Sequence, residues 1–187
     1  MHEIRFHGRG GQGTVVASII LAKTFFEAGY QVQTFPLFGV ERRGAPVEAY
    51  LRLAEEKILV RSNVYEPDYV IVQDPKLISL VDVTRGLKPG GWILLNTPGP
   101  PTDQGPFEGF RLAWVNATGI AVELGLGTRT FPMVNTAMTG AFLRLTEMAP
   151  LDTLLEIITR EIQAKPEQNR KAAARANKEV QLLGPVP

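Results

Sequence analysis

Apolar and polar positions change their spacing along the first third of the chain. Residues 4–6 alternate briefly and predict a strand that ends at Gly8, and residues 31–35 alternate with period two up to Pro36. Between them, residues 14–28 carry apolar side chains at helical spacing and leave almost no polar face, so this helix should be deeply buried. The order strand, glycine turn, helix, strand is that of a βαβ unit.

Four further segments have the pattern of strands. Residues 47–53 alternate cleanly, which predicts an antiparallel or edge strand with one face in water. Residues 69–72 and 92–95 are short continuous apolar runs, as expected of buried strands, and residues 110–115 form the last candidate. The stretch 97–109 holds four prolines and three glycines and is predicted to be irregular.

The remaining apolar patterns predict helices, mainly in the second half of the chain. A short one is expected at 76–83, and longer ones follow at 117–126, 135–148 and 151–163. Asn135 or Thr136 and Asp152 are the candidate caps. Residues 166–183 predict a basic, alanine-rich helix with little apolar surface, which should lean on another surface such as a partner chain.

This alternation of strands and helices predicts an α/β protein. We expect a three-layer α/β/α sandwich whose Rossmann-like sheet is mostly parallel, with one antiparallel strand near 47–53 and with C-terminal helices. Residues 1–187 should form a single domain, made of an α/β core over 1–150 and a helical extension over 151–187.

The composition excludes several kinds of chemistry. The 187 residues include no cysteine, which rules out disulfides, iron–sulfur ligation and a cysteine nucleophile in this chain. Its two histidines, His2 and His7, lie on the first strand and cannot form a metal cluster; neither a metal ligand nor a catalytic residue is assigned. A net charge of +1 argues against nucleic-acid binding. With no signal peptide or membrane span apparent, we expect a cytoplasmic protein.

The turn after the first strand is the clearest candidate binding site. Gly8, Gly10 and Gly13 satisfy G-x-G-x-x-G at the start of the predicted helix, where free N–H groups favour an anion. The same glycines would also suit a tight turn that merely packs against the sheet. His7 either faces the ligand of this turn or is a hydrogen-bonded residue at the strand end.

The second strand lacks the acidic residue that holds the ribose of NAD. The first acid is Glu41, beyond the strand, so NAD binding is disfavoured, whereas Arg42 and Arg43 leave NADP binding open. The two arginines stand between Gly39 and Gly44, and their guanidinium groups suit phosphates and carboxylates. Alternatively, Glu41 pairs with one arginine and the loop has a structural role.

Three motifs together resemble the gamma subunit of the 2-oxoacid:ferredoxin oxidoreductases of the pyruvate and ketoisovalerate type. They are Gly8-Arg9-Gly10-Gly11-Gln12-Gly13, residues 38–46 and the Asn135-Thr136-Ala137-Met138 segment with Gly140 and Ala141. Asp68 and Asp74, on either side of a predicted strand, also sit where that subunit has similar residues. The order and spacing of these motifs cover about residues 1–145.

The resemblance implies a subunit of an enzyme that oxidatively decarboxylates a 2-oxoacid, transfers the acyl group to coenzyme A and passes electrons to ferredoxin. Thiamine diphosphate, Mg²⁺ and iron–sulfur clusters are then expected on partner subunits of the alpha, beta and delta type. On this resemblance, the chain is expected to be inactive alone and to be an accessory part that binds coenzyme A or closes the active site. An isolated copy is expected to be able to form a homodimer.

The cofactor-binding residues assigned on this basis come from the glycine turn, the arginine loop and the third motif: Gly8, Arg9, Gly10, Gly11, Gln12, Gly13, Glu41, Arg42, Arg43 and Asn135. Equivalent motifs could instead hold a partner subunit. Two rival hypotheses stay open: a free-standing NADP-binding reductase and a non-catalytic scaffold subunit.

Overall fold

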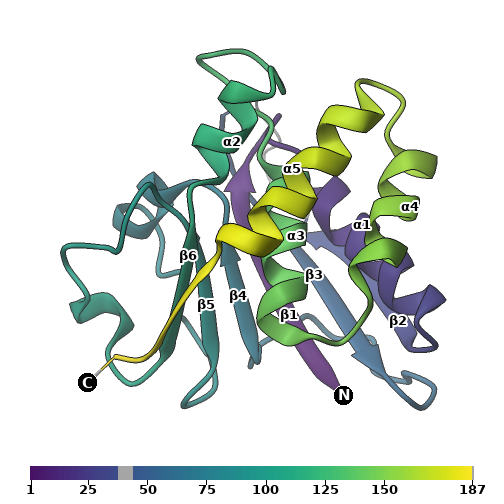
Figure 1. The fold of residues 1–187 in the computed structure, drawn as a ribbon. Coiled ribbons are helices and arrows are strands. Elements are labelled where there is room, and N and C mark those ends of the chain that lie inside the picture. The colour runs from purple at the N-terminus through teal and green to yellow at the C-terminus, as the bar shows by residue number, and fades with distance from the viewer. Residues whose placement is uncertain (38–43, 187) are drawn as a thin grey trace.

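The computed structural model describes residues 1–37 and 44–186, which form a seven-stranded mixed β-sheet with α-helices packed on one face (Figure 1). The strands are β1 (His2–Arg9), β2 (Gln31–Leu37), β3 (Pro46–Ala54), β4 (Tyr69–Val72), β5 (Trp92–Asn96), β6 (Arg111–Val115) and β7 (Gln181–Pro185). The helices are α1 (Thr14–Glu27), α2 (Ala117–Glu123), α3 (Asn135–Thr146), α4 (Leu151–Glu161) and α5 (Pro166–Glu179), with short 3₁₀ helices η1 (Pro75–Ser79) and η2 (Gly105–Phe107).

The strand order confirms the predicted α/β class and the antiparallel direction of the strand near 47–53, and it adds a second antiparallel strand. The order is β2-β3-β1-β4-β5-β6-β7. The pairs β1–β4, β4–β5 and β5–β6 are parallel, whereas β2–β3, β1–β3 and β6–β7 are antiparallel. The predicted antiparallel strand is β3, and β7 is a second one, so the sheet is more mixed than expected.

The last helix ends earlier than its composition predicts. α5 stops at Glu179, and the following residues pair with β6 as the edge strand β7. Contrary to the expectation of little apolar surface, α5 buries Ala172, Ala173 and Ala176 against α3. Because alanine permits close helix packing, α5 packs against α3 of its own chain.

The two faces of the sheet are covered differently. The helices pack on the face that carries Ile4 and Phe6 of β1, in one apolar cluster that also takes in Leu154 of α4. On the opposite face, Val70 and Val72 of β4 are covered by η1, η2 and irregular segments. Within the described residues the third layer therefore contains no α-helix, because the connections that form it are rich in proline and glycine.

The polar side of β3 is buried, which corrects the prediction that it would face water. Tyr50 is 3% exposed and Arg52 is 1% exposed, next to Arg5 and His7 of β1. Arg52 donates hydrogen bonds to Glu3 Oε1 and to the carbonyl oxygen of Asn63. The connection after β3 thus covers polar groups that are already paired with one another.

The first helix is less buried than predicted. Val16, Ile19 and Phe26 form an outward stripe of apolar side chains, and Phe26 is 62% exposed. The opposite side packs on β2, β3, α3 and α4. In the single chain, this helix therefore has an apolar surface on two sides.

The other helices form close to the predicted positions, with different ends and caps. The helix expected at 76–83 is the 3₁₀ helix η1, and the irregular stretch 97–109 contains η2. The N-caps of α3 and α4 are Val134 and Pro150 in place of the polar residues expected there. No helix in the described ranges is both long and apolar enough to cross a membrane.

Candidate functional site

The structure brings the glycine turn and the base of the arginine loop together. Strand β1 continues to Arg9, one residue beyond the predicted end, and the turn then leads into α1. Gly10 N donates to the carbonyl oxygen of Ala45 at 2.9 Å, and Gly44 N donates to the carbonyl oxygen of Gly10 at 3.0 Å. The predicted site residues Glu41, Arg42 and Arg43 lie outside the described residues, between this anchor and β2.

The start of α1 has main-chain donors that find no partner within the described residues. Its N-cap is Gly13, in the left-handed region with φ of 74°, and no side chain caps the helix. Among residues 1–37 and 44–186, no acceptor bonds the N–H of Thr14, Val15 or Val16. The first turn contains no acidic residue. These groups leave the partial positive charge of the helix end uncompensated.

Helix α3 begins beside the same turn. A Cβ placed on Gly13 would lie 2.5 Å from Asn135 Nδ2, so glycine is needed for space as well as for its φ. Asn135 is 3% exposed, and its Oδ1 accepts from Thr136 N. The first turn of α3 also lacks an acid and a side-chain cap. The N-termini of α1 and α3 thus lie side by side at the turn for which the sequence predicts an anion, and Asn135 lies next to Gly13.

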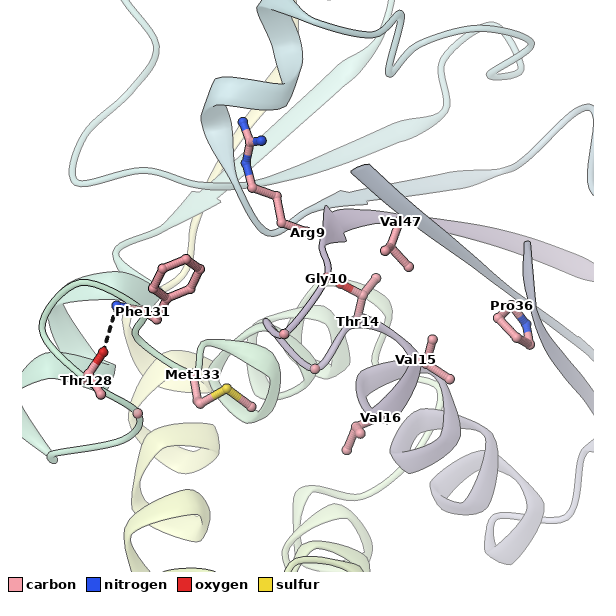
Figure 2. A pocket seen from close by; sticks show the side chains of 13 residues that line it. Arg9, Gly10, Thr14, Val15, Val16, Pro36, Val47, Thr128, Phe131 and Met133 are labelled. Atoms are coloured by element: carbon pink, nitrogen blue, oxygen red, sulfur yellow. Dashed lines mark hydrogen bonds between the residues drawn. The ribbon is translucent and has the colours of Figure 1, made fainter. Parts of the chain in front are cut away.

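A large cavity opens next to the turn. Its volume is about 920 Å³. Figure 2 shows Phe131 and Met133 on one side of the turn, with Val47 and Pro36 on the other. Gly10, Gly11 and Gly13 supply its main-chain wall, and Val15 and Val16 supply the first turn of α1. The cavity therefore combines apolar walls with residues whose N–H groups have no acceptor in the described part of the chain.

Arg9, one of the predicted site residues, is turned away from this cavity. Its Nε donates to Asp74 Oδ2 at 2.7 Å, and its Nη1 donates to the carbonyl oxygen of Gly44 at 3.0 Å. Figure 2 shows its guanidinium group pointing away from Val16 and Met133. Arg9 is one of the residues that line the cavity, but its guanidinium group is paired with Asp74.

Two other predicted residues lie behind the turn. Gly8 is buried inside β1, opposite Val47 of β3. The Gln12 side chain accepts from Arg9 N at 2.8 Å and donates to Asp74 Oδ2 at 3.3 Å. Neither residue lines the cavity, so both support the shape of the turn from within the protein.

His7 does not face the glycine-turn cavity. It is 3% exposed, and its Nε2 accepts from Arg5 Nε at 3.0 Å, which places the imidazole proton on Nδ1, 3.7 Å from Glu48 Oε1. Burial lowers the pKa of His7 to about 4, although Glu48 opposes the shift. His7 is a neutral, hydrogen-bonded residue of the strand. In the described ranges, no group of three or more metal-ligating side chains occurs.

Sequence reasoning missed three parts of the site. Asp74 was named for flanking a strand and as part of the family resemblance, but not as a site residue, and its contact with Arg9 joins residues 65 positions apart. Phe131 and Met133, which line the cavity, stand in a segment without a recognisable motif. Val16 was assigned to a buried helix, yet it is 42% exposed at the cavity. Its place in the third position of a helix that follows a glycine turn was the available signal.

Comparison with known proteins identifies the family. The family model described as pyruvate ferredoxin/flavodoxin oxidoreductase matches residues 3–179. The chain belongs to this family. It is 50% identical to the pyruvate synthase subunit PorC of Methanothermobacter marburgensis, with 94% of each chain covered. It is 47% identical to the common gamma subunit of the pyruvate/ketoisovalerate oxidoreductases of Thermococcus kodakarensis, which covers 94% of this chain and 95% of the relative.

A solved structure agrees with the sequence matches. The pyruvate oxidoreductase subunit PORC of Thermotoga maritima superposes with a TM-score of 0.81 and 32% identity, covering 97% of this chain and 98% of that one. The resemblance to gamma subunits that the three motifs carry is thereby confirmed. The fold of this family is the mixed α/β sheet described above.

Proposed function

We propose that this chain, working as the gamma subunit of a 2-oxoacid:ferredoxin oxidoreductase, binds coenzyme A at the glycine turn. The proposal is supported by an apolar cavity that adjoins main-chain donors for which the described residues supply no acceptor. Coenzyme A fits this combination, because its charged phosphates suit the donors and its uncharged pantetheine arm suits the apolar walls. A cavity of about 920 Å³ lies within the range of roughly 300–1,000 Å³ common for small-molecule sites.

The phosphates would bind at the beginning of α1. The N–H groups of Thr14, Val15 and Val16 are without acceptors in the described part of the chain. A helix N-terminus attracts anions through such donors and through its dipole. The N-terminus of α3 next to Gly13 adds a second dipole of the same sign. Arg42 and Arg43, on the loop anchored at Gly44, are proposed to neutralise a further phosphate charge.

The uncharged arm would lie between the apolar walls. Phe131 and Met133 stand on one side and Val47 and Pro36 on the other, as Figure 2 shows. Covering these side chains removes apolar surface from water, which stabilises the complex by about 25 cal/mol per Å². This chain thus holds and orients the acyl acceptor.

The other steps of the reaction are assigned to partner subunits. Thiamine diphosphate with Mg²⁺ would supply the decarboxylation of the 2-oxoacid, and iron–sulfur clusters would carry electrons to ferredoxin. This chain has no cysteine and cannot supply thiolate ligands for such clusters. We therefore assign these groups to subunits of the alpha, beta and delta type and expect the gamma chain to be inactive alone.

The test is a pair of substitutions at one exposed position. Val16 is the third residue of α1 and is 42% exposed at the cavity. In Val16→Glu, the new carboxylate occupies the helix N-terminus and repels the phosphates, while it favours the helix itself. The apparent KM for coenzyme A of the assembled enzyme should rise about tenfold, equivalent to about 1.4 kcal/mol, with the KM for the 2-oxoacid unchanged and the thermal midpoint no lower than that of the parent.

Val16→Lys is the matched control. It removes the same apolar side chain but carries the opposite charge, so the KM for coenzyme A should stay within about twofold of the parent value. An equal rise in both variants would contradict anion binding at α1. Weakened subunit assembly with unchanged kinetics in Val16→Glu would favour the scaffold hypothesis, and tight binding of NADPH in a titration of the isolated chain would favour the reductase.

A further inference from the structure

Asp74 connects separate parts of the glycine turn from outside the cavity. It follows β4, which runs parallel to β1, so its side chain lies at the carboxyl ends of both strands. One carboxylate oxygen, Oδ2, accepts from Arg9 Nε at 2.7 Å and from Gln12 Nε2 at 3.3 Å. The other, Oδ1, accepts from Lys76 N at 2.9 Å and caps η1. The side chain is 13% exposed, so water competes weakly for these bonds.

Arg9 and Gln12, the two side-chain partners of Asp74, also form hydrogen bonds with the main chain. Arg9 donates from Nη1 to the carbonyl oxygen of Gly44, at the base of the arginine loop. Gln12 accepts from Arg9 N and so closes the turn across its own ends. Arg9 and Gln12 thereby tie the turn and the loop base to the end of β4. The residues of the first turn of α1 line the cavity, and their N–H groups have no acceptor among the described residues.

Asp74 also determines where the Arg9 charge lies. The guanidinium group reaches Asp74 and points away from the cavity walls in Figure 2. Without the carboxylate, the two donors that now converge on Oδ2 would have no common acceptor. Arg9 would then be free to leave the carbonyl oxygen of Gly44, and the turn would lose its outer support.

We propose that Asp74 is a positioning residue, which fixes the glycine turn and the base of the arginine loop in the geometry that binds the phosphates of coenzyme A. It acts through Arg9 and Gln12 and does not touch the ligand. The inference rests on the proposed function, because it concerns the same anion site. It adds a residue from a different strand, which neither the glycine motif nor the arginine loop includes.

The first experiment compares Asp74→Asn with Asp68→Asn in the assembled enzyme. Asparagine can still cap η1, but its NH₂ group then faces the donors of Arg9 and Gln12. Asp68, at the other end of β4, is the matched control, since it also accepts from one backbone N–H and one cation, Glu3 N and Lys88 Nζ. Asp74→Asn should raise the apparent KM for coenzyme A about tenfold and leave kcat and the KM for the 2-oxoacid within twofold. Asp68→Asn should leave all three constants unchanged.

A double-variant cycle tests the route of the effect. If Asp74 acts through Arg9, Arg9→Met and Asp74→Asn together should raise the KM about tenfold, as either does alone, rather than about a hundredfold. Multiplying effects, a lower KM in Asp74→Asn, or an equal rise in Asp68→Asn would overturn the proposal. An unchanged KM in Asp74→Asn overturns it as well, but leaves the proposed function intact provided that Val16→Glu raises the KM.

Discussion

The two faces of the β1–β3 strand pair are both buried from solvent but are stabilised in different ways. On one face, Ile4, Phe6 and Leu51 are fully buried under the helices. On the other face, Arg5 and Arg52 are 1% exposed, although both are cationic. The apolar face is held by removal of surface from water, whereas the polar face depends on every buried donor and acceptor having a partner.

This contrast limits what alternation along a strand can predict. Residues 47–53 alternate as a half-exposed strand would, and the pattern correctly identifies the side that packs under the helices. It wrongly predicts that the other side faces water, because the connections after β3 and β4 cover those polar side chains. Arg5 Nη2 donates to the carbonyl oxygen of Val83, 78 residues away, and no local pattern announces such a contact.

The largest loss of folding stability is expected from a substitution on the apolar face. Phe6→Ala removes a fully buried ring from the centre of the sheet. The free energy of unfolding should fall by about 3–5 kcal/mol, the usual loss for a buried aromatic side chain. Urea unfolding of the purified chain at pH 7.5 measures it. Phe26→Ala on the exposed stripe of α1 is the control and should change the free energy by less than about 1 kcal/mol.

A substitution on the polar face should lower the free energy of unfolding somewhat less, and a second substitution should restore part of the loss. Arg52→Met leaves the Glu3 carboxylate, the Gln33 amide oxygen and the Asn63 carbonyl without their donor. We expect a loss of about 3 kcal/mol in the free energy of unfolding. Adding Glu3→Gln removes the stranded charge and should restore at least about 1 kcal/mol. No recovery in the double variant would show that the face is held by packing alone.

In the candidate site, too, local features could be predicted from the sequence, whereas contacts between distant residues could not. The glycine turn, the start of α1 and the neighbouring Asn135 follow from motifs in the sequence, and the structure places Gly13 and Asn135 side by side. The tie between Arg9 and Asp74 was not predictable, because it requires knowing that β4 lies next to β1 in the sheet. The same gap explains β7, whose strand conformation comes from the open edge of β6.

Composition was misleading where it was used to predict how much of a helix is buried. The alanines of α5 suggested a weakly packed helix, yet Ala172, Ala173 and Ala176 are fully buried. The bulky residues of α1 suggested a helix buried all round, yet Phe26 is mostly exposed. Burial depends on how closely a neighbouring element approaches, and the size of the side chain alone does not fix that distance.

The smallest change in folding stability is expected from protonation of His7, on the polar face. His7 has a pKa of about 4 in the folded chain, lowered by burial from an unfolded value of 6.5, so the unfolded chain binds more protons between these values. Stability should therefore fall as the pH drops from 6.5 towards 4, by about 2 kcal/mol between pH 7.5 and 5.0 for this one group. Glu48, Arg5, Arg85 and Asp82 also act on the imidazole, with Glu48 and Asp82 opposing the shift.

A matched pair of variants isolates this contribution from other titrating groups. His7→Gln keeps an acceptor for Arg5 Nε and removes the titration, so about 2 kcal/mol of the loss between pH 7.5 and 5.0 should disappear. His2→Gln, at the exposed start of the same strand, should keep the pH dependence of the parent. Urea unfolding at the two pH values provides the comparison. If His7→Gln lost as much stability at pH 5.0 as the parent, the buried imidazole would not be the group whose protonation loosens the polar face.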